Sequence, residues 1–235
     1  MKPKQFSDPV ADHATERSSL RIENPPLTLR EMALDRLRNA VIAGLFSPGQ
    51  RLVERVLCDQ LGVSRSVIRE VLRHLEAEGL VGIAPKQGPI VATIDWHQAR
   101  QIYDVRLALE TTAVADCARS ADTATKEKLC QLLDQLDENS TRNDALAILT
   151  VTNSFYETIF HAGGHEIAWD IVARLNGRIS RLRVLTLSTT NRTISGPARM
   201  RLILDAILAV DPDKAREACR AHITEAARIA KSLLA

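Results

Sequence analysis

The sequence lacks the features that mark several large classes of protein. Its 235 residues include four cysteines, none of them in a C-x-x-C pair: Cys58, Cys117, Cys130 and Cys219. A disulfide framework or a zinc ribbon is therefore not expected, and each cysteine is interpreted as a small buried apolar residue. No run approaches the roughly 18 apolar residues of a membrane span, and the N-terminus has no apolar signal core. We expect a cytoplasmic protein without a membrane partner.

Signatures of catalysis and of strong overall charge are missing as well. The chain has no phosphate-binding glycine loop, no H-E-x-x-H pair and no nucleophile elbow, so an enzyme is not expected. The formal net charge is only +2. Affinity for a nucleic acid must therefore come from a local basic patch, because bulk charge does not supply it.

The stretch from Leu61 to Leu80 carries a helix-turn-helix pattern. Gly62 suits a tight turn because it tolerates positive φ, and Ser64 can cap a helix by accepting a backbone N–H. Apolar residues then recur at helical spacing before Gly79 ends the helix: Val67, Ile68, Val71, Leu72 and Leu75. Arginines share another face of this helix: Arg65, Arg69 and Arg73. The second helix of such a motif enters the major groove of DNA.

A β-hairpin is predicted directly after this basic helix. Leu80–Pro85 and Pro89–Thr93 have the composition of strands, and Lys86–Gly88 forms the turn between them. A hairpin in this place corresponds to a wing, whose glycine permits close approach to a phosphate. For each arginine of the preceding helix taken alone, a solvated surface position is an equally good interpretation.

The chain divides into segments by composition. Residues 1–26 are polar and contain several prolines, so they are predicted to be a disordered tail that cannot offset the entropy of ordering. Residues 27–94 hold the predicted DNA-binding domain, which begins with a capping box at Thr28 and Glu31. Residues 95–235 are predicted to form a second, all-helical domain. The predicted fold class is mainly α.

The run PGQRLVERVLCDQLGVSRSVIREVLRHLEAEGL, from Pro48 to Leu80, resembles the winged helix-turn-helix of GntR-family transcriptional regulators. The resemblance implies DNA contacts from the second helix, the start of the recognition helix and the wing tip: Arg55, Ser64, Arg65, Ser66, Arg69, Lys86, Gln87 and Gly88. One departure is Ser66-Val67, where many members have Thr-Pro. Serine can still donate a hydrogen bond to a phosphate, so DNA binding is expected to persist.

These contacts have different expected roles. Arg65 is the main candidate for a bidentate bond to guanine O6 and N7, worth about 1–3 kcal/mol of discrimination between bases. Ser64 and Ser66 suit phosphate, because the helix dipole favours an anion at the start of a helix. Lys86 and Gly88 are expected on the DNA backbone or in the minor groove.

From residue 95 onward the sequence predicts six long helices, at about 95–119, 125–141, 144–162, 166–189, 197–210 and 212–234. This half resembles the all-helical ligand-binding domain (FCD type) of the FadR subgroup of GntR regulators, on residues that include Tyr103–Glu110 and Phe155–Gly164. The resemblance implies a domain for effector binding and dimerisation. Six helices rather than seven favour the VanR-like branch.

Many members of this subgroup hold a divalent metal with one aspartate and three histidines. The matching positions hold Thr152, Tyr156 and Met200, and only His222 remains as a ligand. Threonine, tyrosine and methionine are poor substitutes for carboxylate and imidazole around such a cation. No bound metal and no other cofactor are therefore expected, and the four residues are predicted to line a remaining pocket.

An organic acid is the expected effector. Arg106 matches an arginine that often faces the pocket in this family and can hold a carboxylate bidentately, or it pairs with Glu110 one helical turn away. Arg181, three residues after Arg178, either faces the same cavity or lies on the surface. The predicted effector-binding residues are Arg106, Thr152, Tyr156, Arg181, Met200 and His222.

The leading hypothesis is a homodimeric regulator that binds a double-stranded DNA operator, with repression as the default and a small carboxylate as the controlling ligand. One alternative is a DNA-binding regulator whose helical domain serves only for dimerisation. A helical enzyme that uses Tyr156 and His222 is a further alternative, but nothing near them in the sequence supplies a partner that would orient a base.

Overall fold

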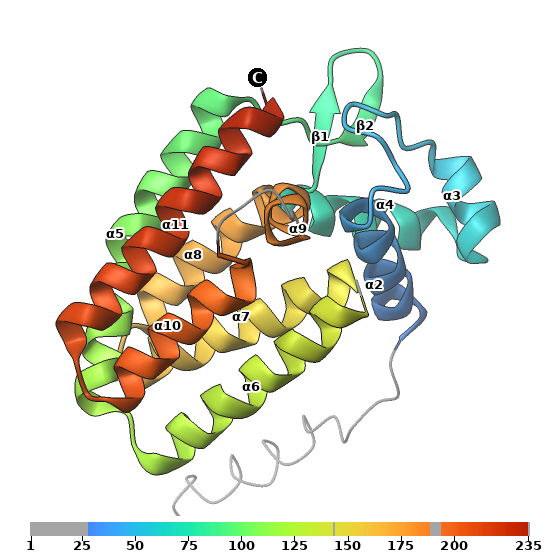
Figure 1. Ribbon diagram of the computed structural model, residues 1–235. Helices are drawn as coiled ribbons and strands as arrows, with labels where there is room; N and C mark the ends of the chain where they lie inside the picture. The colour runs from blue at the N-terminus through green and yellow to red at the C-terminus, as the bar shows by residue number, and fades with distance from the viewer. Residues whose placement is uncertain (1–27, 143, 189–193, 235) are drawn as a thin grey trace, which may run out of the picture.

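The computed structural model describes residues 28–142, 144–188 and 194–234. The predicted tail, residues 1–26, lies outside the described residues, so its disorder stays a prediction. Figure 1 shows two lobes, a smaller one that carries a β-hairpin and a larger bundle of helices. The fold class is mainly α, as predicted.

The smaller lobe is a winged helix-turn-helix. Its elements are α2 (Leu29–Ile42), α3 (Glu54–Leu61), α4 (Arg65–Ala77), β1 (Val81–Ala84) and β2 (Gly88–Val91). The two strands pair antiparallel with Val81 opposite Val91. One apolar cluster holds helices and hairpin together, and its buried members include Leu37, Leu52, Ile68, Leu75 and Val91.

Two local devices fix the ends of this lobe. Helix α2 begins at the predicted capping box, in which the Glu31 N–H donates to Thr28 Oγ1 at 3.2 Å and the Thr28 N–H donates to Glu31 Oε2 at 2.8 Å. The segment before α3 joins the wing as a short extra strand, because the Leu52 N–H donates to the Pro89 carbonyl at 2.8 Å. The loop that precedes α3 is therefore held against the hairpin.

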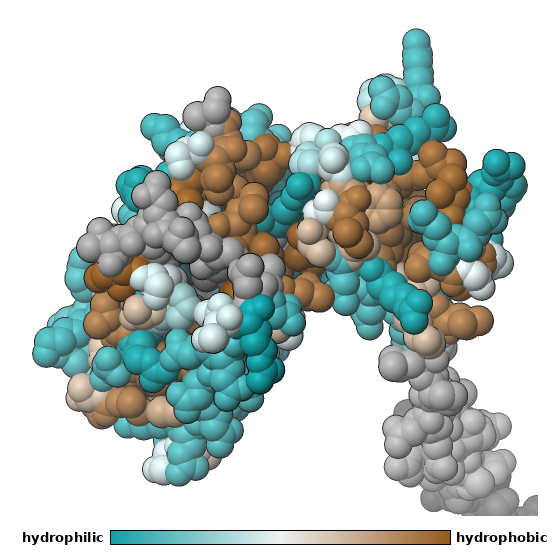
Figure 2. Space-filling model, turned by 45° about the vertical axis from the view of Figure 1, so that its right-hand side comes forward, coloured by the Kyte–Doolittle hydropathy of each residue, from teal (hydrophilic) through white to brown (hydrophobic). Residues whose placement is uncertain are grey.

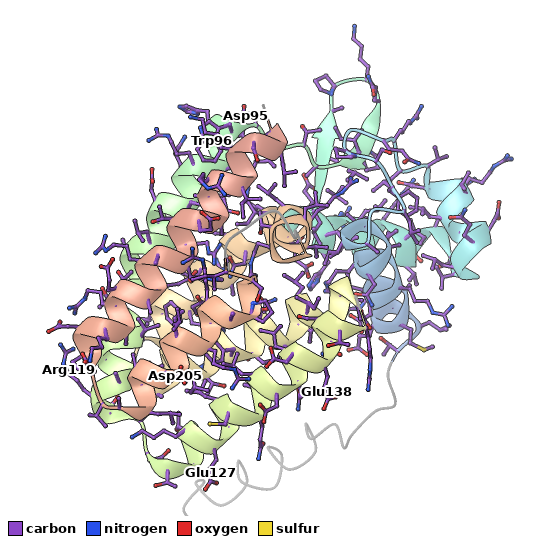
Figure 3. The ribbon with its side chains drawn as sticks, viewed as in Figure 1. Asp95, Trp96, Arg119, Glu127, Glu138 and Asp205 are labelled. Carbon is purple, nitrogen blue, oxygen red and sulfur yellow. The ribbon has the colours of Figure 1, made fainter. Side chains whose placement is uncertain are left out.

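The larger lobe is built from helices throughout its described part. They are α5 (Trp96–Ser120), α6 (Thr123–Thr141), α7 (Ala145–Ala162), α8 (Glu166–Arg178), α9 (Ser180–Ser188), α10 (Gly196–Leu208) and α11 (Pro212–Leu234). Helices α5 and α11 lie side by side along one edge of the molecule, and α10 packs against α11. Figure 3 places Trp96 near the end of α11, where Lys231 Nζ lies 6.0 Å from the centre of the Trp96 ring.

The described part of this lobe has seven helices, one more than the six predicted. The predicted helix at 166–189 is two helices, because Ile179 leaves helical geometry at φ −111° and ψ 13° and separates α8 from α9. The boundary is corrected accordingly, and the VanR-like branch loses the support of the helix count. None of the described helices combines the length and apolar character needed to cross a membrane.

The two lobes are packed against each other at one junction. Leu149 of α7 and Val184 of α9 are buried in the apolar cluster of the winged lobe. At the end of α8, a Cβ at Gly177 would lie 2.7 Å from the carbonyl oxygen of Glu78, just beyond α4. A Cβ at Gly79 would overlap the side chain of Arg178. The absence of a side chain lets the backbones approach closely at Gly177, and at Gly79 it leaves room for the Arg178 side chain.

Candidate DNA-binding groove and buried charge cluster

The start of α4 is fixed by the two residues that the sequence pattern singled out. Gly62 ends α3 in the left-handed conformation, at φ 67°, and its N–H donates to the Cys58 carbonyl at 2.9 Å. Ser64 then caps α4 by accepting the Val67 N–H at 3.4 Å, and its Oγ lies 2.8 Å from Oγ of Ser66. Both serines are exposed at the positive end of the helix dipole, which favours an anion there.

The tip of the wing has a tight and unusual backbone. Lys86 has φ 65° and Gly88 has φ 79°, and the Gln87 N–H closes the turn on the Ala84 carbonyl at 3.1 Å. The positive φ of Gly88 suits glycine, whereas that of Lys86 is rarely adopted by a residue with a side chain. The turn presents the exposed side chains of Lys86 and Gln87 beside the start of α4.

One surface groove gathers most of the predicted DNA contacts. This groove, the DNA groove below, has a volume of about 380 Å³. Segments far apart in the sequence line it, with predicted contacts Arg55, Arg65, Lys86, Gln87 and Gly88. Within the described part of the chain, none of its cations takes part in an ion pair. Glu54 also lines the groove, but its carboxylate pairs with Arg69 outside it. Positive charge therefore predominates in the groove, as a surface that binds phosphate requires.

Arg51 also lines the DNA groove, and sequence reasoning did not select it. It belongs to the short extra strand, where it pairs with Ile90 of the wing. Pairing with the wing would have revealed Arg51 as a neighbour of Lys86.

The remaining predicted contacts lie around the groove rather than in it. Ser64 and Ser66 stand at the start of α4, as described above. Arg69 lines a neighbouring surface hollow, and its Nε lies 3.1 Å from both carboxylate oxygens of Glu54. The charge of Arg69 is therefore partly compensated within the protein, unlike that of Arg65.

The helical bundle holds a different kind of arginine. Arg106 and Glu110, one turn apart on α5, form an ion pair with Nε to Oε1 at 2.7 Å, and their side chains are 3% and 1% exposed. Burial by itself lowers the pKa of the Arg106 guanidinium, but the carboxylate of Glu110 raises it overall. The pairing that the sequence allowed is thus present, in the interior of the bundle and not on its surface.

Arg183 of α9 is the second buried arginine, and sequence reasoning missed it. Its Nη1 donates to Oδ1 of Asn153 at 2.6 Å, and the residue is 3% exposed. Burial lowers the pKa of Arg183 to about 10, and the positive charge of Arg106 adds to this shift. Arg183 therefore stays charged near neutral pH. Arg106, Glu110 and Arg183, called the buried charge cluster below, carry two positive charges and one negative charge.

Four further predicted effector residues are also in the interior. Thr152 and Tyr156 of α7, Met200 of α10 and His222 of α11 are each at most 4% exposed. The Tyr156 and His222 rings lie 6.4 Å apart, and Thr152 Oγ1 donates to the Ile148 carbonyl at 2.7 Å. These residues face the same core that contains the buried charge cluster.

Arg181 is placed elsewhere. Its Nη1 donates to the carbonyl of Phe46 in the winged lobe at 3.3 Å, and it lines a pocket between the two lobes. Helix α9 thus places its two arginines differently. Arg183 is buried in the bundle, and Arg181 lies at the junction of the lobes.

Comparison with known proteins agrees with this architecture. Residues 29–91 match the family described as bacterial regulatory proteins, gntR family, and residues 101–225 match the FCD domain. The chain belongs to the GntR family of transcriptional regulators. Proteins of this family bind DNA and usually act as dimers, and FCD domains bind small-molecule effectors. This GntR regulator is accordingly a DNA-binding protein. The resemblance of its two halves to a GntR winged helix-turn-helix and an FCD domain is confirmed, and the VanR-like branch is not.

Its relatives extend over most of the chain. An HTH-type transcriptional regulator of Streptomyces ambofaciens is 30% identical, over 80% of this chain and 79% of its own length. The HTH-type transcriptional repressor RspR of Escherichia coli is 26% identical, over 86% of this chain and 89% of its own. The solved structure of Escherichia coli McbR has the same fold, with a TM-score of 0.72 at 24% identity, and covers 89% of this chain and 100% of its own.

The metal that many FCD proteins hold does not fit the residues of this GntR regulator. At the positions predicted to match the ligands, Thr152, Tyr156 and Met200 supply neither carboxylate nor imidazole, and His222 is the only predicted position with a ligand of those types. Among the residues that the structure describes, no three His, Cys, Asp or Glu side chains form a group able to hold a metal ion. The absence of a bound metal stays a prediction.

Proposed function

We propose that this regulator reads an operator through the DNA groove and that an organic acid, bound at the buried charge cluster, controls its affinity for DNA. The observation that carries the first half is the meeting of Arg55, Arg65 and Lys86 in one groove, none of them in an ion pair with a described residue. The excess positive charge of the buried charge cluster supports the second half.

The groove residues divide between base and backbone contacts. Arg65, in the first turn of α4, is proposed to bind guanine O6 and N7, and Ser64 and Ser66 beside it bind phosphate. Lys86 holds the DNA backbone or the minor groove from the wing tip, and Arg55 serves either role. In a homodimer, two such surfaces read the two half-sites of a near-palindrome.

The buried charge cluster has one excess positive charge, which favours the binding of an anion. Glu110 neutralises one of two buried arginines, and the amide of Asn153 binds the other without neutralising it. A buried charge without a counter-charge is costly, so a carboxylate that reaches Arg183 gains a strong, charge-assisted pair. Such a ligand shifts DNA affinity only if it binds one arrangement of the lobes better than another. We infer repression relieved by ligand, as the name of the repressor RspR suggests for a relative.

The DNA half is tested by electrophoretic mobility shift with the DNA upstream of the regulator's own gene. Arg65→Ala should reduce discrimination between the operator and a scrambled site by about 10- to 100-fold, the equivalent of 1–3 kcal/mol. Arg142→Ala, an exposed arginine after α6, is the matched control and should change little. Equal discrimination by the Arg65→Ala protein, with its fold intact by circular dichroism, would refute the proposed base contact.

The effector half is tested by a thermal-shift screen over sugar acids, aliphatic acids and aromatic acids. A true ligand stabilises the folded state by mass action and so raises the melting temperature. At a concentration 100 times its Kd, the free energy of unfolding rises by about 2.7 kcal/mol. The rise should be lost in Arg183→Gln, measured against that variant's own ligand-free melting temperature. If no acid stabilises the wild-type protein, the alternative of a bundle used only for dimerisation is favoured.

A metal analysis tests the cofactor prediction. Purified protein dialysed against buffer without chelator should contain less than stoichiometric zinc, nickel and manganese. A stoichiometric metal that survives dialysis would show that Thr152, Tyr156, Met200 and His222 have been matched to the wrong family positions.

A further inference from the structure

A pocket lies at the junction of the two lobes, away from the buried charge cluster. This junction pocket has a volume of about 400 Å³. The winged lobe lines it with Leu80 and residues 91–94, the break between α8 and α9 with residues 178 and 180–182, and α11 with Leu233 and Leu234. Most of these residues are apolar, and Figure 2 shows apolar surface running between the lobes. The pocket thus has two walls that belong to different parts of the protein.

Among the described residues that line the junction pocket, the charged ones are all of one sign. They are Arg178 and Arg181, with no acidic residue in the described lining. Neither arginine takes part in an ion pair within the described part of the chain, and Arg181 donates only to the neutral carbonyl of Phe46. The first turn of α9, which starts at Ser180, adds the positive end of a helix dipole. An anion is therefore favoured at this end of the pocket.

Ser180 points to a missing partner at the same place. It lines the pocket and is 4% exposed, and its Oγ has no hydrogen-bond partner among the described residues. Buried hydroxyl groups nearly always have a partner, because an unpaired one loses its hydrogen bonds to water. A ligand that accepts a hydrogen bond from Ser180 would remove this deficit.

We propose that the junction pocket is a second small-molecule site that takes an amphipathic monocarboxylate. The carboxylate binds Arg181 and Ser180, and the hydrocarbon part lies along the apolar wall formed by Leu80, Leu182 and Leu185. An aliphatic chain of about eight to ten carbons suits this volume, since small-molecule pockets enclose most of their ligand. The site is separate from the effector site proposed in the bundle and does not depend on it.

Occupation of this site acts on the arrangement of the lobes. The wall at Leu80 and residues 91–94 belongs to the winged lobe, and the wall at α9 belongs to the bundle. A ligand that touches both walls binds best when the lobes keep one relative position, and by linkage it stabilises that position. The wing and α4 then hold a fixed orientation toward DNA while the ligand is bound.

Isothermal titration of the full-length protein with decanoate below its micellar concentration tests the site. We expect one saturable site per chain in the wild-type protein. Arg181→Gln removes the charged partner, and Leu185→Glu places a carboxylate on the pocket wall, where Leu185 is 48% exposed. Arg181→Gln should weaken binding at least about tenfold, the effect of losing one charge-assisted hydrogen bond. Leu185→Glu should also weaken binding, because its carboxylate repels that of the ligand and replaces an apolar contact.

Two variants serve as controls. Leu202→Glu on α10 changes a leucine of the same 48% exposure outside the pocket, and it should bind decanoate like the wild type. Arg183→Gln removes the effector contact proposed in the bundle, and it shows at which of the two sites decanoate binds. The proposal is overturned if the wild type shows no saturable site, if Arg181→Gln and Leu185→Glu bind normally, or if only Arg183→Gln loses binding. That last result would place decanoate in the bundle and would favour the effector site proposed above.

Discussion

The DNA groove and the buried charge cluster use arginine in opposite ways. In the groove, Arg55 and Arg65 are exposed and make no ion pair with the described residues. In the cluster, Arg106 and Arg183 are buried and held by Glu110 and Asn153. Water stabilises the exposed charges at little cost, so they remain available to phosphate. The buried charges need partners from the protein or from a ligand.

This contrast separates two kinds of functional residue. Removing an exposed arginine should affect DNA binding and leave the stability of the fold almost unchanged. Removing a member of the buried charge cluster should lower the stability of the fold, and any effect on regulation should follow from that loss of stability. The following predictions test this division, from the largest effect to the smallest.

Removal of the buried carboxylate should have the largest effect. Glu110→Gln leaves Arg106 and Arg183 without a buried counter-charge among the described residues, and we expect a loss of about 3–5 kcal/mol in the free energy of unfolding. Urea denaturation followed by circular dichroism measures it. Asp104→Asn is the control on the same helix, because its 61% exposed carboxylate pairs with Arg100 at 3.5 Å and should contribute at most about 1 kcal/mol. Similar losses in both variants would contradict the distinction between buried and exposed charge.

The junction between the two regions should respond to a single methyl group. In Gly177→Ala the new Cβ meets the backbone carbonyl of Glu78 at 2.7 Å, so α8 and the end of α4 must move apart. We expect a destabilisation of about 1–3 kcal/mol, typical of overpacking. Limited proteolysis should also cleave the variant faster between the lobes. Gly82→Ala, where a Cβ meets nothing within 4 Å, is the matched control and should behave like the wild type.

The wing lysine should contribute to affinity without selecting sequence. Lys86→Ala is expected to weaken binding to operator DNA and to scrambled DNA by the same factor. It should also reduce the slope of log K against log salt concentration by about one. Fluorescence anisotropy at several salt concentrations measures the slope. A change in discrimination between the two DNA sequences would mean that Lys86 contacts a base. Arg65→Ala should show the reverse pattern.

The half-buried pair of Asp116 and His165 should give the smallest effect. Their side chains lie 2.8 Å apart, and the hydrogen bond from His165, with Arg119 nearby, lowers the pKa of the Asp116 carboxyl. A group with a lowered pKa in the folded state stabilises the protein above its unfolded pKa, and this stabilisation disappears as pH falls through the folded value. The wild type should therefore exceed Asp116→Asn in stability near pH 6 and lose that advantage below about pH 4. An advantage that persists at pH 2 would rule out this origin.

Sequence reasoning located the DNA-binding lobe well because its signals are local. Gly62 and Ser64 determine the turn and the cap by their own chemistry, and both adopt the expected conformations. The hairpin follows from the order of apolar residues and turn residues, and the structure confirms it at Val81–Val91. Arg51 was missed because its proximity to the wing depends on strand pairing across a sequence distance of almost forty residues.

The bundle was harder to predict because small errors in helix phase move side chains to other faces. Gly177 is the residue that could have indicated a break in this segment. A single helix over residues 166–189 instead continues the same helical phase past this glycine. The break at Ile179 resets that phase, so Arg183 is buried and Arg181 reaches Phe46. A rotation of 100° per residue makes such an error sufficient to exchange an interior position for a surface one.

The backbone of Lys86 implies a conflict at the wing tip. Its φ of 65° lies in a region that costs a residue with a side chain about 1–2 kcal/mol relative to ordinary conformations. Glycine at this position would relax the turn, at the cost of a more flexible unfolded chain and of the positive charge. Thermal stability and affinity for the operator therefore place opposite demands on this one residue. A variant selected only for heat resistance would be expected to bind DNA more weakly.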